Sequence, residues 1–124
     1  MKRIVLIFIL FFSVFTLISC NKNYESISAK EAKNLMDNES NYVILDVRTK
    51  SEYDSGHIPG AILIPEDEIK DTAENILKDK NQLILVYCRS GRRSKNAAKE
   101  LTKMGYTNVK EFGGIIDWSY EIEY

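Results

Sequence analysis

The chain has 124 residues, which fits one domain and leaves little room for a second. Its 17 basic and 18 acidic residues give a formal net charge of −1. So balanced a charge argues against a nucleic-acid-binding protein, and we expect no nucleic-acid partner.

The first nineteen residues have the composition of a signal peptide. Lys2 and Arg3 form a short basic head, and an uncharged apolar run extends from Ile4 to Leu17. That run is shorter than the roughly 20 residues that a helix needs to cross a bilayer. Leu17-Ile18-Ser19-Cys20 then resembles a lipobox, the motif after which bacterial lipoproteins are cleaved and lipidated.

We therefore expect residues 1–19 to be removed and Cys20 to carry lipid, which would hold the protein on the periplasmic face of a bacterial membrane. An ordinary signal peptide and an uncleaved anchor are the alternatives. Residues 20–26 are polar and predict a tether, and residues 27–124 predict the folded domain. With Cys20 lipidated, Cys88 is the only thiol left, and an unpaired thiol outside the cytoplasm indicates a chemical use.

The domain alternates helix and strand patterns in chain order. Ser28 and Glu31 have the spacing of a capping box, and Thr49 and Glu52 repeat it before a short helical turn. Apolar runs rich in β-branched residues predict strands, and amphipathic runs predict helices. The predicted helices cover 29–37, 49–55, 66–78, 94–104 and 115–121, the predicted strands cover 42–47, 61–64, 83–87 and 107–112, and turns are predicted at 56–60 and 113–114.

This alternation predicts an α/β fold with a mostly parallel sheet and helices on both faces. Functional residues of such sheets lie beyond the carboxyl ends of the strands. The strand predicted at 83–87 runs directly into Cys88, so we expect Cys88 at that edge.

The loop after Cys88 favours its thiolate form. Backbone N–H groups between a strand end and a helix start lack helical partners and can turn toward an anion. A helix beginning near Ser94 adds a partial positive charge, and Gly91 lets the backbone curl sharply. Three cations stand in the same segment: Arg89, Arg92 and Arg93.

Two alternatives stay open for these residues. Cys88 could be a small buried apolar residue, although an arginine-rich loop is a poor apolar environment. At least one of the three arginines could simply be solvated. We expect Arg93 to be the arginine that faces the substrate. Arg89 is the next candidate, and Arg92 ranks last.

Several motifs resemble the rhodanese (thiosulfate sulfurtransferase) family, and more narrowly its small single-domain, periplasmic phage-shock type. The resemblance extends from about Ile27 to Trp118. The motifs are Leu45-Asp46-Val47-Arg48 with Glu52-Tyr53, Gly56-His57-Ile58-Pro59-Gly60-Ala61, Cys88-Arg89-Ser90-Gly91-Arg92-Arg93-Ser94, Met104-Gly105-Tyr106, and Gly113-Gly114-Ile115 through Trp118.

The resemblance implies a five-stranded, central, mostly parallel sheet and a Cys88 that cycles between thiolate and persulfide. It implies that Asp46 and Arg48 are structural, and that His57 fixes a turn instead of acting as a base. It also implies that the loop amides bind the transferred sulfur or its donor; these belong to Arg89, Ser90, Gly91, Arg92, Arg93 and Ser94.

The predicted function is therefore sulfur transfer from thiosulfate or a persulfide to a thiol or protein acceptor, without a metal or other cofactor. A cysteine-dependent phosphatase or arsenate reductase is a rival, but in the phosphatase loop the arginine comes one position later than Arg93. The shorter loop suits a sulfur atom better than a tetrahedral phosphate. A partner-binding module or a sulfur carrier remains a second alternative.

Overall fold

The computed structural model describes residues 24–124. The predicted signal peptide and the predicted lipidation site at Cys20 lie outside the described residues. In the part that is described, none of the helices combines the length and apolar character needed to span a bilayer.

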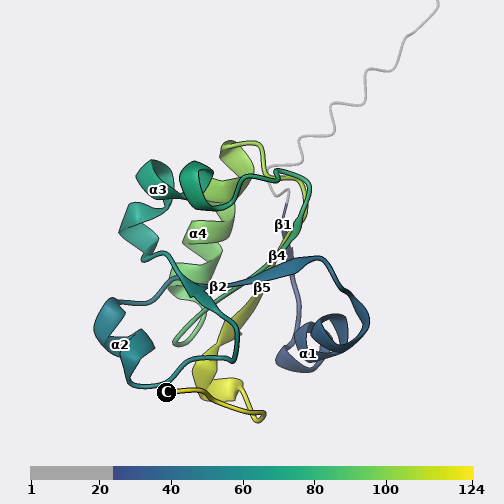
Figure 1. Cartoon of the computed structure of the whole chain (residues 1–124), viewed down its shortest axis with the longest axis vertical. Helices are drawn as coiled ribbons and strands as arrows, with labels where there is room; N and C mark the ends of the chain where they lie inside the picture. Colours follow the sequence, from purple (N-terminus) through teal and green to yellow (C-terminus); the bar gives the residue numbers. More distant parts are fainter. Residues whose placement is uncertain (1–23) are drawn as a thin grey trace, which may run out of the picture.

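The described residues form one five-stranded sheet with helices on both sides (Figure 1). The strands are β1 (Tyr24–Ser26), β2 (Tyr42–Asp46), β3 (Ile62–Leu63), β4 (Leu83–Cys88) and β5 (Val109–Gly114). The α-helices are α1 (Ala29–Asn38), α2 (Lys50–Asp54), α3 (Ile69–Ile76) and α4 (Arg92–Lys103), and the short 3-10 helices are η1 (Glu66–Glu68) and η2 (Ile115–Asp117).

The strand order is β1-β5-β4-β2-β3, and every neighbouring pair is parallel. The predicted α/β fold with a five-stranded parallel sheet is therefore confirmed. β4 lies at the centre, between β5 and β2, so its carboxyl end is bordered by strand on both sides. This arrangement puts Cys88, the last residue of β4, in the middle of the carboxyl edge of the sheet, where the sequence predicted it.

Alternate residues of β4 enter two different cores, because successive side chains of a strand point to opposite faces. Cys88 belongs to the core that includes residues of α3 and α4. Tyr87 belongs to the opposite core, together with Phe112, Trp118 and residues of α1. The neighbouring residues Tyr87 and Cys88 therefore pack on opposite faces of the sheet.

The capping box predicted at Thr49 is complete, whereas only the N-cap half of the one predicted at Ser28 is present, because the Glu31 carboxylate accepts from the Ser28 hydroxyl and not from its backbone N–H. The Ser28 hydroxyl accepts a hydrogen bond of 3.0 Å from the Glu31 N–H at the start of α1. The Thr49 hydroxyl accepts from the Glu52 N–H, and the Glu52 carboxylate accepts from the Thr49 N–H, which completes the capping box of α2. These helices begin where the local sequence predicted.

The tether prediction was wrong for its last three residues. Tyr24–Ser26 form β1 and pair in register with residues 109–111 of β5. Tyr24 is buried in the core of the α3 and α4 side. The edge strand therefore draws its stability from a partner more than 80 positions away, which no local pattern reveals.

The carboxyl-terminal predictions were also partly wrong. Gly113 and Gly114, expected in a turn, end β5, and the helix expected at 115–121 is only the 3-10 turn of η2. After η2 the chain returns to the loop before β3, where His57 and Glu123 exchange two backbone hydrogen bonds of 2.9 and 2.8 Å. This return path of the chain takes the place of the helix expected after Asp117.

Candidate active site

Cys88 is 1% exposed and is the last residue of β4. The Gly91 N–H donates a hydrogen bond of 2.9 Å to its Sγ. Gly91 has a φ of +120°, a conformation that favours glycine, and α4 begins at the next residue. The predicted sharp curl at Gly91 is confirmed, and it aims a backbone donor at the sulfur.

The amino terminus of α4 adds further donors beside the sulfur. The helix begins at Arg92, two residues earlier than predicted, and no side chain among residues 24–124 caps it. The N–H groups of a helix's first turn have no acceptor within the helix. Those of Arg92, Arg93 and Ser94 can therefore serve an anion held against Cys88, with support from the helix dipole.

The end of β5 closes the Cys88 loop from the opposite side. A Cβ atom placed on Gly114 would lie 1.8 Å from the carbonyl oxygen of Arg89 and 2.5 Å from the nitrogen of Ser90. The Ile116 N–H donates a 3.3 Å hydrogen bond to the same Arg89 carbonyl. Only a glycine allows β5 to approach the loop this closely.

The three loop arginines are placed differently. Arg93, expected to face the substrate, donates two hydrogen bonds of 2.6 and 2.9 Å to the Glu52 carboxylate. These bonds, together with those from Thr49, hold the pKa of Glu52 at about 2 although partial burial opposes the shift. Arg89 and Arg92 are exposed, and their side chains make no hydrogen bond or ion pair within the described chain.

Ser94 is fully buried, and its hydroxyl lies between the Cys88 sulfur and a buried acid. Ser94 Oγ lies 3.5 Å from Cys88 Sγ and 3.0 Å from Glu111 Oε2. Glu111 in β5 is only 2% exposed. Glu111 was not singled out from the sequence. The signal that could have identified it is an acidic residue inside a short strand, just before Gly113-Gly114.

Asp46 and Arg48 form a buried network on the strand next to Cys88. Arg48 donates to both carboxylate oxygens of Asp46, at 2.7 to 3.1 Å, and to the Gly56 carbonyl at 2.7 Å. Tyr87 donates a 2.7 Å hydrogen bond to Asp46 and accepts one from the Ile58 N–H. Burial and the Asp46 carboxylate both raise the pKa of the Tyr87 hydroxyl. All these contacts tie the loop after α2 to the sheet, in keeping with the structural role predicted for Asp46 and Arg48.

His57 contacts the end of α2 and the chain terminus. Its Nδ1 lies 2.9 Å from the Tyr53 carbonyl, and its ring stacks on that of Tyr53 with centroids 3.8 Å apart. Its Nε2 lies 3.6 Å from the Glu123 carboxylate. These partners are the kind that fix a turn, so the expectation that His57 is not a base stays a prediction that fits the geometry.

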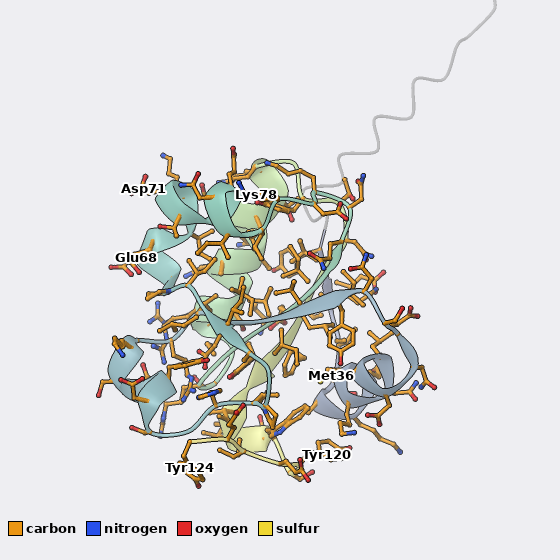
Figure 2. The ribbon with its side chains drawn as sticks, in the orientation of Figure 1. Met36, Glu68, Asp71, Lys78, Tyr120 and Tyr124 are labelled. Carbon is orange, nitrogen blue, oxygen red and sulfur yellow. The ribbon has the colours of Figure 1, made fainter. Side chains whose placement is uncertain are left out.

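An open hollow of about 450 Å³ lies elsewhere on the molecule, between α1 and the terminal segment. Figure 2 shows Met36 of α1 and Tyr120 of that segment on the same side of the fold. No residue of the Cys88 loop lines this hollow. The hollow is therefore separate from Cys88 and the donors around it.

Comparisons with known proteins agree with this geometry. Residues 28–121 match the family described as "Rhodanese-like domain". Over 73 residues the chain is 42% identical to thiosulfate sulfurtransferase PspE of Escherichia coli, covering 59% of this chain and 70% of PspE. Over 91 residues it is 41% identical to UBA4 of Meyerozyma guilliermondii, an adenylyltransferase and sulfurtransferase, covering 68% of this chain but only 22% of UBA4.

A solved structure is similar as well. The structure described as "rhodanese with anions from E. coli" aligns with a TM-score of 0.63 and 38% identity, over 66% of this chain and 96% of that one. The relatives support sulfur transfer or sulfur carriage as the general activity of this domain. The chain belongs to the rhodanese-like domain family.

Proposed function

We propose that this protein is a sulfurtransferase that passes a sulfane sulfur through a persulfide on Cys88. The observation that carries the proposal is the 2.9 Å hydrogen bond from the Gly91 N–H to Cys88 Sγ, at the amino terminus of α4. A donor in that position stabilises negative charge on sulfur, both in the thiolate and in the persulfide.

In the first step the Cys88 thiolate attacks the outer sulfur of the donor. With thiosulfate, a sulfur–sulfur bond forms to Cys88, the bond between the two sulfur atoms of thiosulfate breaks, and sulfite leaves with the electron pair. The persulfide anion then occupies the space faced by the first-turn N–H groups of α4. The donor is proposed to be thiosulfate or a persulfide, since PspE is named for the former.

In the second step a nucleophilic acceptor attacks the outer sulfur of the persulfide. The new bond forms to the acceptor, and the electron pair of the broken bond returns to Cys88 as thiolate. Cyanide serves in an assay, and we propose a thiol or a protein as the cellular acceptor.

A sulfur-carrier role is the second candidate, and one feature favours it. The Ile116 side chain is 58% exposed, and its backbone N–H is bonded to Arg89 of the loop. An exposed apolar side chain whose own backbone contacts the Cys88 loop suits contact with a protein that hands over or collects the sulfur.

We also propose that the protein is lipid-anchored at Cys20 outside the cytoplasm, as in the small periplasmic type that its motifs resemble. The basic head, the short apolar run and the Leu17-Cys20 tetrapeptide support this. Labelling of the full chain with a fatty-acid analogue should be lost in Cys20→Ala and retained in Ser19→Ala.

The test of the activity uses residues 21–124, which include the whole sheet. This protein should convert thiosulfate and cyanide to thiocyanate, and Cys88→Ser should abolish the reaction without unfolding the protein. Intact mass after thiosulfate treatment should show one added sulfur atom on the wild type alone. If the protein hydrolyses an aryl phosphate and transfers no sulfur from thiosulfate, the proposal is wrong and the protein is a phosphatase.

A further inference from the structure

A buried carboxylate lies one hydroxyl group away from the reactive sulfur. Glu111 Oε2 accepts a 3.0 Å hydrogen bond from the Gly113 N–H and lies 3.0 Å from Ser94 Oγ. Ser94 Oγ in turn lies 3.5 Å from Cys88 Sγ. The transfer steps described above give Glu111 no part, although it is 2% exposed and on the same face as the sulfur.

Little positive charge compensates Glu111 from the elements packed around it. From α4, Lys95 Nζ approaches Oε1 to 3.8 Å, but the Lys95 side chain is 53% exposed. From β1, the residue opposite Glu111 is the uncharged Ser26. From β4, the neighbouring titratable group is Cys88 itself.

Apart from Lys95, no cation of the described residues is paired with Glu111. Arg93 of α4 is bound by Glu52 of α2, as described above. Arg89 and Arg92 are exposed, and neither forms an ion pair with Glu111. Lys110, the residue before Glu111, is bound by Glu25 of β1. A thiolate at Cys88 and a carboxylate at Glu111 would thus be two negative charges in one buried cluster, with only the Ser94 hydroxyl between them.

The Ser94 hydroxyl can relay a proton between the sulfur and the carboxylate, because it lies within hydrogen-bond reach of both. The Ser94 hydroxyl has one hydrogen but faces three acceptors: Gly91 O at 2.8 Å, Glu111 Oε2 at 3.0 Å and Gly113 O at 3.4 Å. Two neighbouring acids in a buried site do not both ionise readily, and their titrations become coupled. A proton shared between sulfur and carboxylate would keep the cluster at a single negative charge.

We propose, on the basis of the sulfur transfer proposed above, that Glu111 is a positioning residue that holds the Cys88 proton through Ser94 while the sulfur is anionic. As the thiolate forms, the S–H bond breaks and its proton passes to Ser94 Oγ. The Ser94 O–H bond breaks in the same step, and that proton binds Glu111 Oε2. The thiol and carboxylate become thiolate and carboxylic acid, with no net change of charge.

The same proton stays on Glu111 while Cys88 carries the persulfide anion. It remains there when the acceptor removes the sulfur and the thiolate returns, and it goes back to sulfur through Ser94 in the resting enzyme. The buried cluster therefore accommodates a charged sulfur without a second buried charge.

Infrared difference spectroscopy tests the proposal directly. The spectrum of the Cys88 persulfide minus that of the resting thiol should contain the C=O stretch of a protonated carboxylic acid. The band should shift on ¹³C-glutamate labelling, disappear in Glu111→Gln, move in Glu111→Asp, and persist in Glu100→Gln, a matched change on α4. Absence of the band in wild-type protein that mass spectrometry shows to be persulfidated overturns the proposal.

The alkylation rate of the thiol gives a second, independent readout. At neutral pH iodoacetamide should alkylate Cys88 several-fold more slowly in Glu111→Gln than in the wild type, because the glutamine amide cannot take up the proton that the thiol has to lose. Equal rates with intact folding would contradict the proposal. Alkylation does not require sulfur transfer, so a protein inactive with thiosulfate but showing this slower alkylation would overturn the sulfurtransferase assignment and leave the Glu111 coupling in place.

Discussion

Arg93 and Glu52 bind each other through two hydrogen bonds across 41 positions of sequence. The Thr49 N–H donates to the same Glu52 carboxylate at 3.2 Å. The pair therefore links α2, through its capping box, to the first turn of α4 beside Cys88. Because of this pair, Arg93, one of the three cations of the Cys88 loop, is already neutralised by Glu52 when no substrate is bound.

The first prediction concerns the stability of this link. Glu52 has a pKa of about 2 in the folded protein and an ordinary value of 4.5, so folding is stabilised above about pH 4.5 and this contribution is lost as the pH falls toward 2. Glu52→Gln should lower the free energy of unfolding by about 1–2 kcal/mol at neutral pH, and this difference from the wild type should vanish as the pH falls to about 2 and below. Urea unfolding of the wild type and the variant across this pH range measures the difference. Asp54→Asn, which removes the exposed pair with Lys50 in the same helix, is the control and should cost less than about 0.5 kcal/mol.

The second prediction concerns donor binding. Because Arg93 is paired and Arg89 and Arg92 are not, Arg89→Gln and Arg92→Gln should each raise KM for thiosulfate about three- to tenfold with a smaller effect on kcat. Glu52→Gln should lower KM, since it releases Arg93 for the anion. Steady-state kinetics at low and high salt would separate these effects. A KM that rises most in Arg93→Gln, with unchanged stability, would show that Arg93 leaves Glu52 to bind the donor.

The third prediction concerns the buried network below the loop. Tyr87→Phe removes the hydrogen bond to Asp46 and leaves the Ile58 N–H without its acceptor. We expect a loss of about 1–3 kcal/mol in the free energy of unfolding, with kcat per folded molecule within about twofold of wild type. Denaturant titration and the thiocyanate assay on the same sample measure the two quantities. A large fall in kcat without a loss of stability would give this network a catalytic part.

The fourth prediction concerns the contact between β5 and the Cys88 loop. Gly114→Ala places a methyl group against the Arg89 carbonyl, so the backbone has to move and sulfur transfer should fall about a hundredfold or more. Gly60→Ala is the matched control: its φ is +80°, but a Cβ there meets nothing within 4 Å. It should cost about 1 kcal/mol of stability and leave kcat unchanged. Equal activity in the two variants would refute the importance of the close approach.

Local sequence patterns were enough to predict the framework of this fold. The N-cap at Ser28, the capping box at Thr49 and the apolar run before Cys88 depend on neighbours a few residues away, and each predicted its element correctly. The curl at Gly91 was predictable for the same reason, since it needs only a glycine between a strand and a helix.

Contacts between distant residues were not predictable in this way. β1 exists because residues 24–26 pair with β5, and Glu111 reaches Ser94 because the pairing of β5 with β4 sets that distance. The pairing of Arg93 with Glu52 likewise depends on how α2 lies against α4. A single sequence shows which residue types could make such contacts, but it does not show which distant residues the fold brings together.

The inclusion of Tyr24 in β1 determines how a membrane-attached form would present its sulfur. Because all strands are parallel, Tyr24 begins at the amino edge of the sheet, level with Ile84, while Cys88 ends β4 at the carboxyl edge. With lipid on Cys20, the four residue steps to Tyr24 span at most about 14 Å. The amino edge would then rest near the bilayer with its opposite end outward, and Cys88 would exchange sulfur with molecules arriving from the aqueous side.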